Sequence, residues 1–175
     1  MNLTIAELLD YTDEERAKWQ SWFAAHGNEP LKLALGNEQH STVGALMMHI
    51  FWAELWYAYR MRGEPFMPDS EIVKQHKDIP HDQAEAVFKF GQLARASLRS
   101  FTDAAKPEDW ERHYELAAQG FRLHGPARKL IAHILIHEIR HWAPIALAVR
   151  QHGTAPPGDH DLLFSASFGP LGSRV

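Results

Sequence analysis

Four long segments whose apolar residues recur at three- and four-residue spacings limit the folds open to this chain. Such spacing gives a helix one apolar face, which must be buried against another element. We expect the helices from Thr4 to Gly27, from Ser41 or Thr42 to Gly63, from Pro80 or His81 to a break at Pro107, and from Gly125-Pro126 to His152, with Gly153 as terminator. Helices of about 20 to 27 residues, each roughly 30 to 40 Å long, pack well as a bundle. The sequence therefore predicts an all-α chain with a four-helix bundle fold.

The ends of these helices carry local signals of their own. Thr4 and Glu7 form a capping-box pattern, in which each side chain accepts a hydrogen bond from the free backbone N–H of the other residue. Gly27 follows the last periodic residue, where glycine commonly ends a helix. Pro80 is compatible with a helix start, because proline is tolerated in the first turn.

The connections between the helices predict how the bundle is wound. Residues 63–80 contain three prolines, and this connection is long enough to cross the bundle from end to end. We therefore expect an up-down-down-up order with a long crossover between the second and third helices. Residues 112–124 hold a Gln-Gly pair between two short mixed runs, which indicates an irregular, hairpin-like excursion.

Length and composition agree with one globular domain and a tail. The chain has 175 residues, of which 45% are hydrophobic and 23% charged, and these values are ordinary for a single domain. We expect residues 1–153 to form one bundle domain. Residues 154–175 are rich in glycine, proline and serine, so we expect an irregular tail that packs on the bundle. The apolar side chains expected to dock it are Leu162, Leu163 and Phe164.

Charge and cysteine content exclude several classes of function. The chain has no cysteine, which excludes disulfides, thiolate metal ligands and a cysteine nucleophile. The formal charge is −4 and the basic residues are scattered, so nucleic acid binding is unsupported. No apolar run approaches the roughly 18 residues of a membrane span, and the N-terminal residues lack the pattern of a signal peptide. These features lead us to expect a cytoplasmic protein.

The string HEIRH, residues 137–141, is the most suggestive motif in the chain. His-Glu-x-x-His is the pattern of a zinc protease, Glu-x-x-His is half of a di-iron bundle signature, and His-x-x-x-His places two imidazoles on one helical face. The three interpretations require different partners elsewhere in the sequence.

The rest of the chain completes neither of the first two patterns. An extended protease motif requires glycine at 144 and histidine at 147, where this chain has Pro144 and Leu147. No glutamate follows Glu138, and no other glutamate has a histidine three residues on. The protease ligands left over lie in or next to the tail: His152, Asp159, His160 and Asp161. Glu138 is therefore expected to be a surface carboxylate or an outer-shell partner of the histidines.

Two adjacent histidines of this helix can supply two ligands to one ion. His133, His137 and His141 follow at four-residue spacing, which places neighbouring imidazoles about 6 Å apart at Cβ. The outer pair is separated by roughly 12 Å of helix rise, so only an adjacent pair can share an ion. A third ligand must come from another helix, and His49 lies in the most apolar stretch of the second one. An unpaired buried imidazole is costly, which makes His49 the natural candidate.

Four stretches of this chain resemble the DinB/YfiT-like superfamily of metal-binding four-helix bundles. The resemblance covers nearly the whole chain and rests on LLDYTDEER, HIFWAELWYAYRMRGEP, LIAHILIHEIRHWAPIALAVRQHG and PPGDHDLLF. Carried over by position, the resemblance implies metal ligation by His49, His137 and His141 and no ligand role for His133. It also implies a homodimer.

The chain departs from the superfamily just after the last histidine. Many members continue there with Arg-Gly-Gln, where this chain has Trp142-Ala143-Pro144. Pro144 removes a backbone hydrogen bond to Arg140 and favours a kink near the site. Substrate preferences therefore do not transfer from any one member.

The resemblance also implies a class of chemistry. Characterised members are metal-dependent transferases and isomerases that use a low-molecular-weight thiol such as bacillithiol or mycothiol. We therefore expect a thiol S-transferase-like enzyme with zinc or nickel, a small-molecule substrate and an external thiol, because the chain has no cysteine of its own. Two alternatives stay open: a non-catalytic metal-binding or stress-associated protein, and a metal-dependent hydrolase that uses a bound water.

Overall fold

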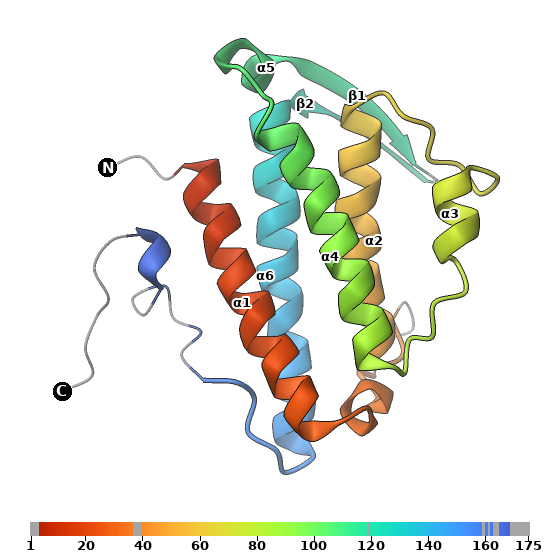
Figure 1. Ribbon diagram of the computed structural model, residues 1–175, viewed down its shortest axis with the longest axis vertical. Helices are drawn as coiled ribbons and strands as arrows, with labels where there is room; N and C mark the ends of the chain where they lie inside the picture. Colours follow the sequence, from red (N-terminus) through yellow and green to blue (C-terminus); the bar gives the residue numbers. More distant parts are fainter. Residues whose placement is uncertain are drawn as a thin grey trace.

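Four long helices form the body of the molecule (Figure 1). The computed structural model describes residues 4–36, 40–118, 120–158, 160, 162 and 165–168. The long helices are α1 (Ile5–His26), α2 (Val43–Met61), α4 (Ala84–Thr102) and α6 (Ala127–Gln151). In the view of Figure 1, α1 and α6 run downwards, while α2 and α4 run upwards. The chain is mostly helical, as the sequence predicts.

The starts of α1 and α2 follow the local sequence signals closely, whereas those of α4 and α6 follow them less closely. Thr4 and Glu7 form the predicted capping box, and Gly27 ends α1 with a φ of 74°. The side chain of Thr42 caps α2. In contrast, α4 begins at Ala84 rather than at residue 80 or 81, and α6 begins at Ala127. The helix of α6 continues through Pro144 to its end at Gln151.

Short elements occupy the connections. The segment between α2 and α4 contains α3 (Glu71–His76), which returns the chain from the upper end of α2 to the lower end of α4 (Figure 1). In the described part of the chain, the 3₁₀ helix η1 (Glu29–Lys32) follows α1, and the 3₁₀ helix η3 (Ala166–Phe168) lies in the C-terminal segment. The helix α5 (Pro107–Glu111) begins at the proline that was expected only to break the third helix.

The prediction of a purely α-helical chain is wrong at residues 113–126. The strands β1 (His113–Ala118) and β2 (Phe121–Pro126) form an antiparallel hairpin at the upper end of the bundle (Figure 1). The hairpin-like excursion expected near residues 112–124 is therefore a regular two-stranded sheet. Its strand β2 includes Gly125 and Pro126, which is why α6 starts later than expected.

The core consists of two apolar clusters, one in each half of the bundle. The lower cluster is built around the fully buried rings of Trp19, Phe23 and Phe51. The upper cluster contains the buried Leu98 and Ile131 and extends to the hairpin. The turn before α4 packs closely enough on α2 to select glycine: a Cβ built at Gly44 would lie 1.9 Å from the backbone oxygen of His81.

A layer of buried charge lies between the two clusters. The four long helices contribute one residue each: Arg16, Glu54, Arg95 and Glu138. Their exposed fractions are only 8%, 2%, 6% and 2%, respectively. Since the two guanidinium groups match the two carboxylates in number, the layer is neutral as a whole. Charges buried in this way are stable only when they are fully paired.

The described part of the C-terminal segment lies against α1. Trp22 Nε1 donates to the carbonyl of Ala155 at 2.7 Å, and the Tyr11 hydroxyl donates to the carbonyl of His160 at the same distance. Leu162, which was expected to dock, is 48% exposed, so that prediction is wrong. Leu163 and Phe164 lie outside the described residues.

Candidate metal centre

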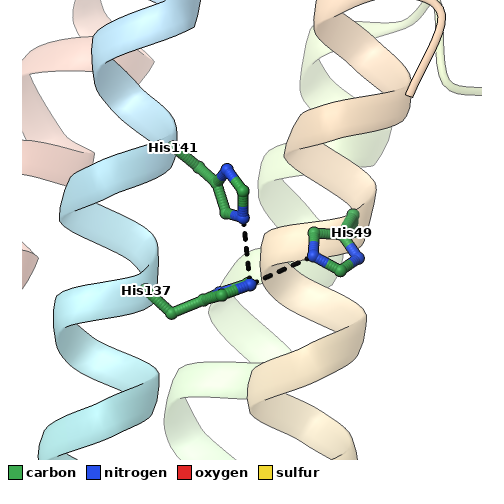
Figure 2. A group of neighbouring side chains, drawn as sticks. All are labelled: His49, His137 and His141. Atoms are coloured by element: carbon green, nitrogen blue, oxygen red, sulfur yellow. Dashed lines mark hydrogen bonds between the residues drawn. The ribbon is translucent and has the colours of Figure 1, made fainter. Parts of the chain in front are cut away.

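Three imidazoles meet between α2 and α6. Figure 2 shows His49 extending from α2 towards His137 and His141, which lie one turn apart on α6. The Nε2 atom of His137 lies 3.1 Å from Nε2 of His49 and 2.9 Å from Nε2 of His141. One nitrogen from each ring can be chosen so that all three lie within 4.8 Å of one another. The structure therefore brings together the three histidines that the sequence singled out.

The spacing of these nitrogens suits a shared ion. Two nitrogens that each lie about 2.0–2.1 Å from one metal ion are roughly 2.9–3.4 Å apart for angles between 90° and tetrahedral. Both measured separations, 2.9 and 3.1 Å, fall in this interval. All three donors are imidazoles, which bind zinc, nickel, copper and iron well.

The environment keeps these imidazoles neutral, which ligation requires. Burial, together with the neighbouring histidines His40 and His141, lowers the pKa of His49 to about 4. Burial lowers the pKa of His137 to about 3, with contributions from the adjacent imidazoles and the Arg140 guanidinium. At neutral pH both rings therefore offer a lone pair rather than a positive charge.

A fourth histidine, which the sequence analysis missed, flanks the group. His40 precedes α2, and its ring centroid lies 4.1 Å from that of His49 and 6.4 Å from that of His141. Burial lowers the pKa of His40 as well. No periodic pattern marked this residue, because it lies outside the long helices. Its only signal in the sequence was its residue type.

A cleft opens directly beside the imidazoles. It has a volume of about 440 Å³ and is bounded by His49, Trp52, Ala53, Trp56, Tyr57, Phe66, His133, Ile134 and His137. Most of the wall is aromatic. Apart from the two histidines of the site, the lining residues with an ionisable side chain are Tyr57 and His133. Burial raises the pKa of Tyr57 to about 12, so its hydroxyl keeps its proton at neutral pH.

His133 lies outside the three-histidine group but borders the same cleft. Its ring centroid is 6.0 Å from that of His137 and 6.0 Å from that of Tyr57. It therefore lies where it can contact a molecule bound in the cleft, one helical turn away from the nearest of the three histidines.

Glu138, the central acid of HEIRH, is turned into the bundle interior. Its carboxylate accepts hydrogen bonds from Arg16 Nε at 2.6 Å, Arg16 Nη2 at 2.8 Å and Arg95 Nη2 at 2.9 Å. Trp142 Nε1 donates to it at 3.3 Å. The prediction of a surface carboxylate is wrong, because Glu138 is 2% exposed. A carboxylate held by two guanidinium groups is in no position to act as the base of a protease.

The remaining candidates for a protease ligand are directed elsewhere or lie outside the described residues. The Nδ1 atom of His152 lies 2.9 Å from the carbonyl oxygen of Ala148, and Nδ1 of His160 contacts the Glu15 carboxylate. Asp159 and Asp161 are among the residues that the structure does not describe.

The match of the chain to a known family covers almost all of this architecture. The profile of the DinB family matches residues 1–168. The chain belongs to the DinB family. None of the curated proteins compared with it matches. Among solved structures, a DinB-like protein from Bacillus subtilis is similar in fold, with a TM-score of 0.59 at 16% identity. The similarity covers 87% of this chain and 96% of the other.

Within this DinB bundle, no helix in the described part of the chain is long and apolar enough to cross a membrane. The DinB family is metal-binding in general, and the three-histidine group is the feature of this member that fits a metal ion. Nothing in the sequence identified Arg16 and Arg95 as the buried partners of Glu138. Glu54, which pairs with the same two arginines, was marked in the sequence as a lone carboxylate inside the apolar stretch FWAELW.

Proposed function

We propose that this DinB-family protein is a metal-dependent enzyme that transfers a low-molecular-weight thiol to a small electrophile. His49, His137 and His141 hold a divalent transition metal ion, with zinc or nickel as the first candidates. The observation that carries the proposal is the convergence of three neutral imidazoles beside an open, aromatic cleft. A purely structural ion would need no such opening.

An ion held by these three histidines would supply Lewis acidity, which would lower the pKa of a thiol so that the thiol releases its proton to solvent and becomes a nucleophile at neutral pH. The external thiol is necessary because the chain contains no cysteine. Three protein ligands leave room for such a co-substrate, as in other catalytic sites with three protein ligands.

The residues of the cleft have separate roles in this proposal. Trp52, Trp56 and Phe66 form an apolar wall that binds the carbon skeleton of the electrophile and excludes water from it. The Tyr57 hydroxyl, protonated at neutral pH, can donate a hydrogen bond to a leaving group. In the transfer, the thiol sulfur forms a bond to an electrophilic carbon, and the leaving group departs with the electrons of the bond that breaks.

A metal-dependent hydrolase is the second candidate, and the position of His133 favours it. An imidazole on the cleft wall, one turn from His137, can accept a proton from an attacking water. A non-catalytic role, in which the ion only links α2 to α6, is the third candidate. We further propose a homodimer, from the resemblance to the superfamily. From the charge and apolar pattern of the sequence, we also propose a cytoplasmic protein that engages neither nucleic acid nor membrane.

Elemental analysis of natively purified protein tests the metal ligands. We expect about one equivalent of divalent metal in the wild type, and loss of it in each of His49→Ala, His137→Ala and His141→Ala. His133→Ala is the matched control, since it removes an imidazole from the same helix face and should leave the metal in place. Retention of the metal in His49→Ala would refute the three-histidine site.

Turnover assays then separate the three candidates. The metal-loaded protein is incubated with 1-chloro-2,4-dinitrobenzene and each member of a thiol panel, and separately with p-nitrophenyl acetate without thiol. Thiol-dependent release of chloride that disappears in His49→Ala supports the transferase. Thiol-independent ester hydrolysis supports the hydrolase, and inactivity of the loaded protein in both assays supports the structural role.

A further inference from the structure

The hairpin presents one face to solvent, and that face carries two histidines. Side chains alternate along each strand, so Leu116 and Leu123 turn towards the bundle, and Leu116 is 3% exposed. His113, Glu115 and His124 occupy the opposite face and are exposed. This face belongs to β1 and β2 and is built from other elements than the three-histidine group on α2 and α6.

The two imidazoles lie close enough together to bind one ion. Nδ1 of His113 lies 3.4 Å from Nε2 of His124, and the ring centroids are 5.0 Å apart. At this separation the pair makes at most a long hydrogen bond. Two nitrogens bound at about 2.0–2.1 Å to a tetrahedral ion are separated by roughly 3.4 Å. The observed separation therefore matches a shared metal ion.

Glu115 can supply a third donor. In the strand register it stands directly opposite His124, where Cβ atoms of facing residues are about 4.5–5.5 Å apart. Among the described residues its carboxylate has no hydrogen bond or ion pair, so it is free to turn towards the imidazoles. Arg122 is on the same face, two residues before His124 in β2 and opposite Ala117.

We propose that His113, His124 and Glu115 form a second, solvent-exposed site for a divalent transition metal ion of the zinc, nickel or copper class. Two imidazoles and one carboxylate are donors that suit these ions. The ion joins the two strands of the hairpin and exchanges readily with solvent. Because both rings are exposed, the site binds more weakly than the three-histidine group and fills second.

Calorimetric titration of the chelated, full-length protein with Zn²⁺ tests this site. We expect two equivalents to bind to the wild type, the second at least ten-fold more weakly than the first. His113→Ala and His124→Ala should each bind one equivalent, and Glu115→Gln should weaken the second step by ten-fold or more. His152→Ala is the matched control, because it removes a histidine outside both groups and should still bind two equivalents. Circular dichroism confirms that each variant is folded.

The same titration distinguishes failure of the exposed hairpin site from failure of the interior three-histidine site. His49→Ala should lose the tighter equivalent and keep the weaker one, whereas His113→Ala should do the reverse. A wild type that binds a single equivalent, or a second equivalent that persists in His113→Ala and His124→Ala, would overturn the exposed site without affecting the interior one.

Discussion

Replacing Glu138 with glutamine tests how the buried charge layer stabilises the bundle. The substitution keeps the shape of the side chain but removes one of the two carboxylates that balance Arg16 and Arg95. Arg95 keeps Glu54 and the partly exposed Asp13 as partners, at 2.7 Å each. Arg16 keeps Glu54 as its one described carboxylate partner, together with the Gly91 carbonyl at 3.0 Å. Its Nε atom then faces an amide in place of a carboxylate oxygen at 2.6 Å.

The expected cost follows from the net charge left in the interior. The wild-type layer sums to zero, and Glu138→Gln leaves one uncompensated positive charge. Burial would lower the pKa of Arg16, but the charges of Glu138 and Glu54 outweigh it and raise this pKa above its usual value, so Arg16 stays charged in the folded wild type. Breaking a buried pair of this kind costs about 3–5 kcal/mol. For a chain of this length that corresponds to a fall in Tm of roughly 6–20 °C.

Thermal and chemical unfolding of the chelated protein provide the measurement. Glu111→Gln is the matched control, because Glu111 pairs with Arg128 at 2.7 Å on the surface, where both side chains are more than half exposed. Its expected cost is below about 1 kcal/mol. At temperatures where Glu138→Gln is folded, its metal content should equal that of the wild type. The structural role of Glu138 would be refuted if Glu138→Gln lowered the free energy of unfolding by less than about 1 kcal/mol. A fall in metal content without a fall in stability would refute it too.

Two further predictions concern packing and pH. Gly44→Ala should lower the free energy of unfolding by about 1–3 kcal/mol or more, because the new Cβ would lie 1.9 Å from the backbone oxygen of His81. A denaturant titration measures this change. Gly158→Ala is the control and should be neutral, because nothing lies within 4 Å of its added Cβ. The metal-free protein should lose stability as the pH falls from about 6.5 towards 4, because the lowered pKa values of His49 (about 4) and His137 (about 3) mean that the unfolded state takes up protons that the folded state does not. Unfolding curves measured at several pH values give the free energy of unfolding as a function of pH. This free energy should fall less steeply with falling pH in the double variant His49→Asn, His137→Asn than in the wild type. An equal slope in the two proteins would contradict the lowered pKa values.

The parts of the fold that the sequence predicts well are those encoded by neighbouring residues. The capping box of Thr4 and Glu7 spans three residues, and Gly27 ends α1 through its own conformation. The hairpin was only partly predicted, because residues 112–124 show no clear alternation in the sequence. Its strand pairing depends instead on burial of Leu116 against the bundle.

The candidate site divides in the same way. His137 and His141 are neighbours on one helix turn, so their spacing alone placed them together, and His49 stood out as a polar residue in an apolar stretch. Glu138 was misplaced because its partner Arg16 is 122 residues away in the sequence. Such a distant pair leaves no periodic trace, and a charged residue on a helix is exposed unless such a partner exists.

The charge layer also has a consequence for how this sequence can change over time. Each single replacement in the layer strands at least one charge in the interior, whereas exchanging a whole buried ion-pair set for apolar residues is often neutral or even favourable. The four positions are therefore separated from an apolar alternative by intermediates of low stability, and descendants of this chain should either keep the set of two arginines and two glutamates or lack it entirely.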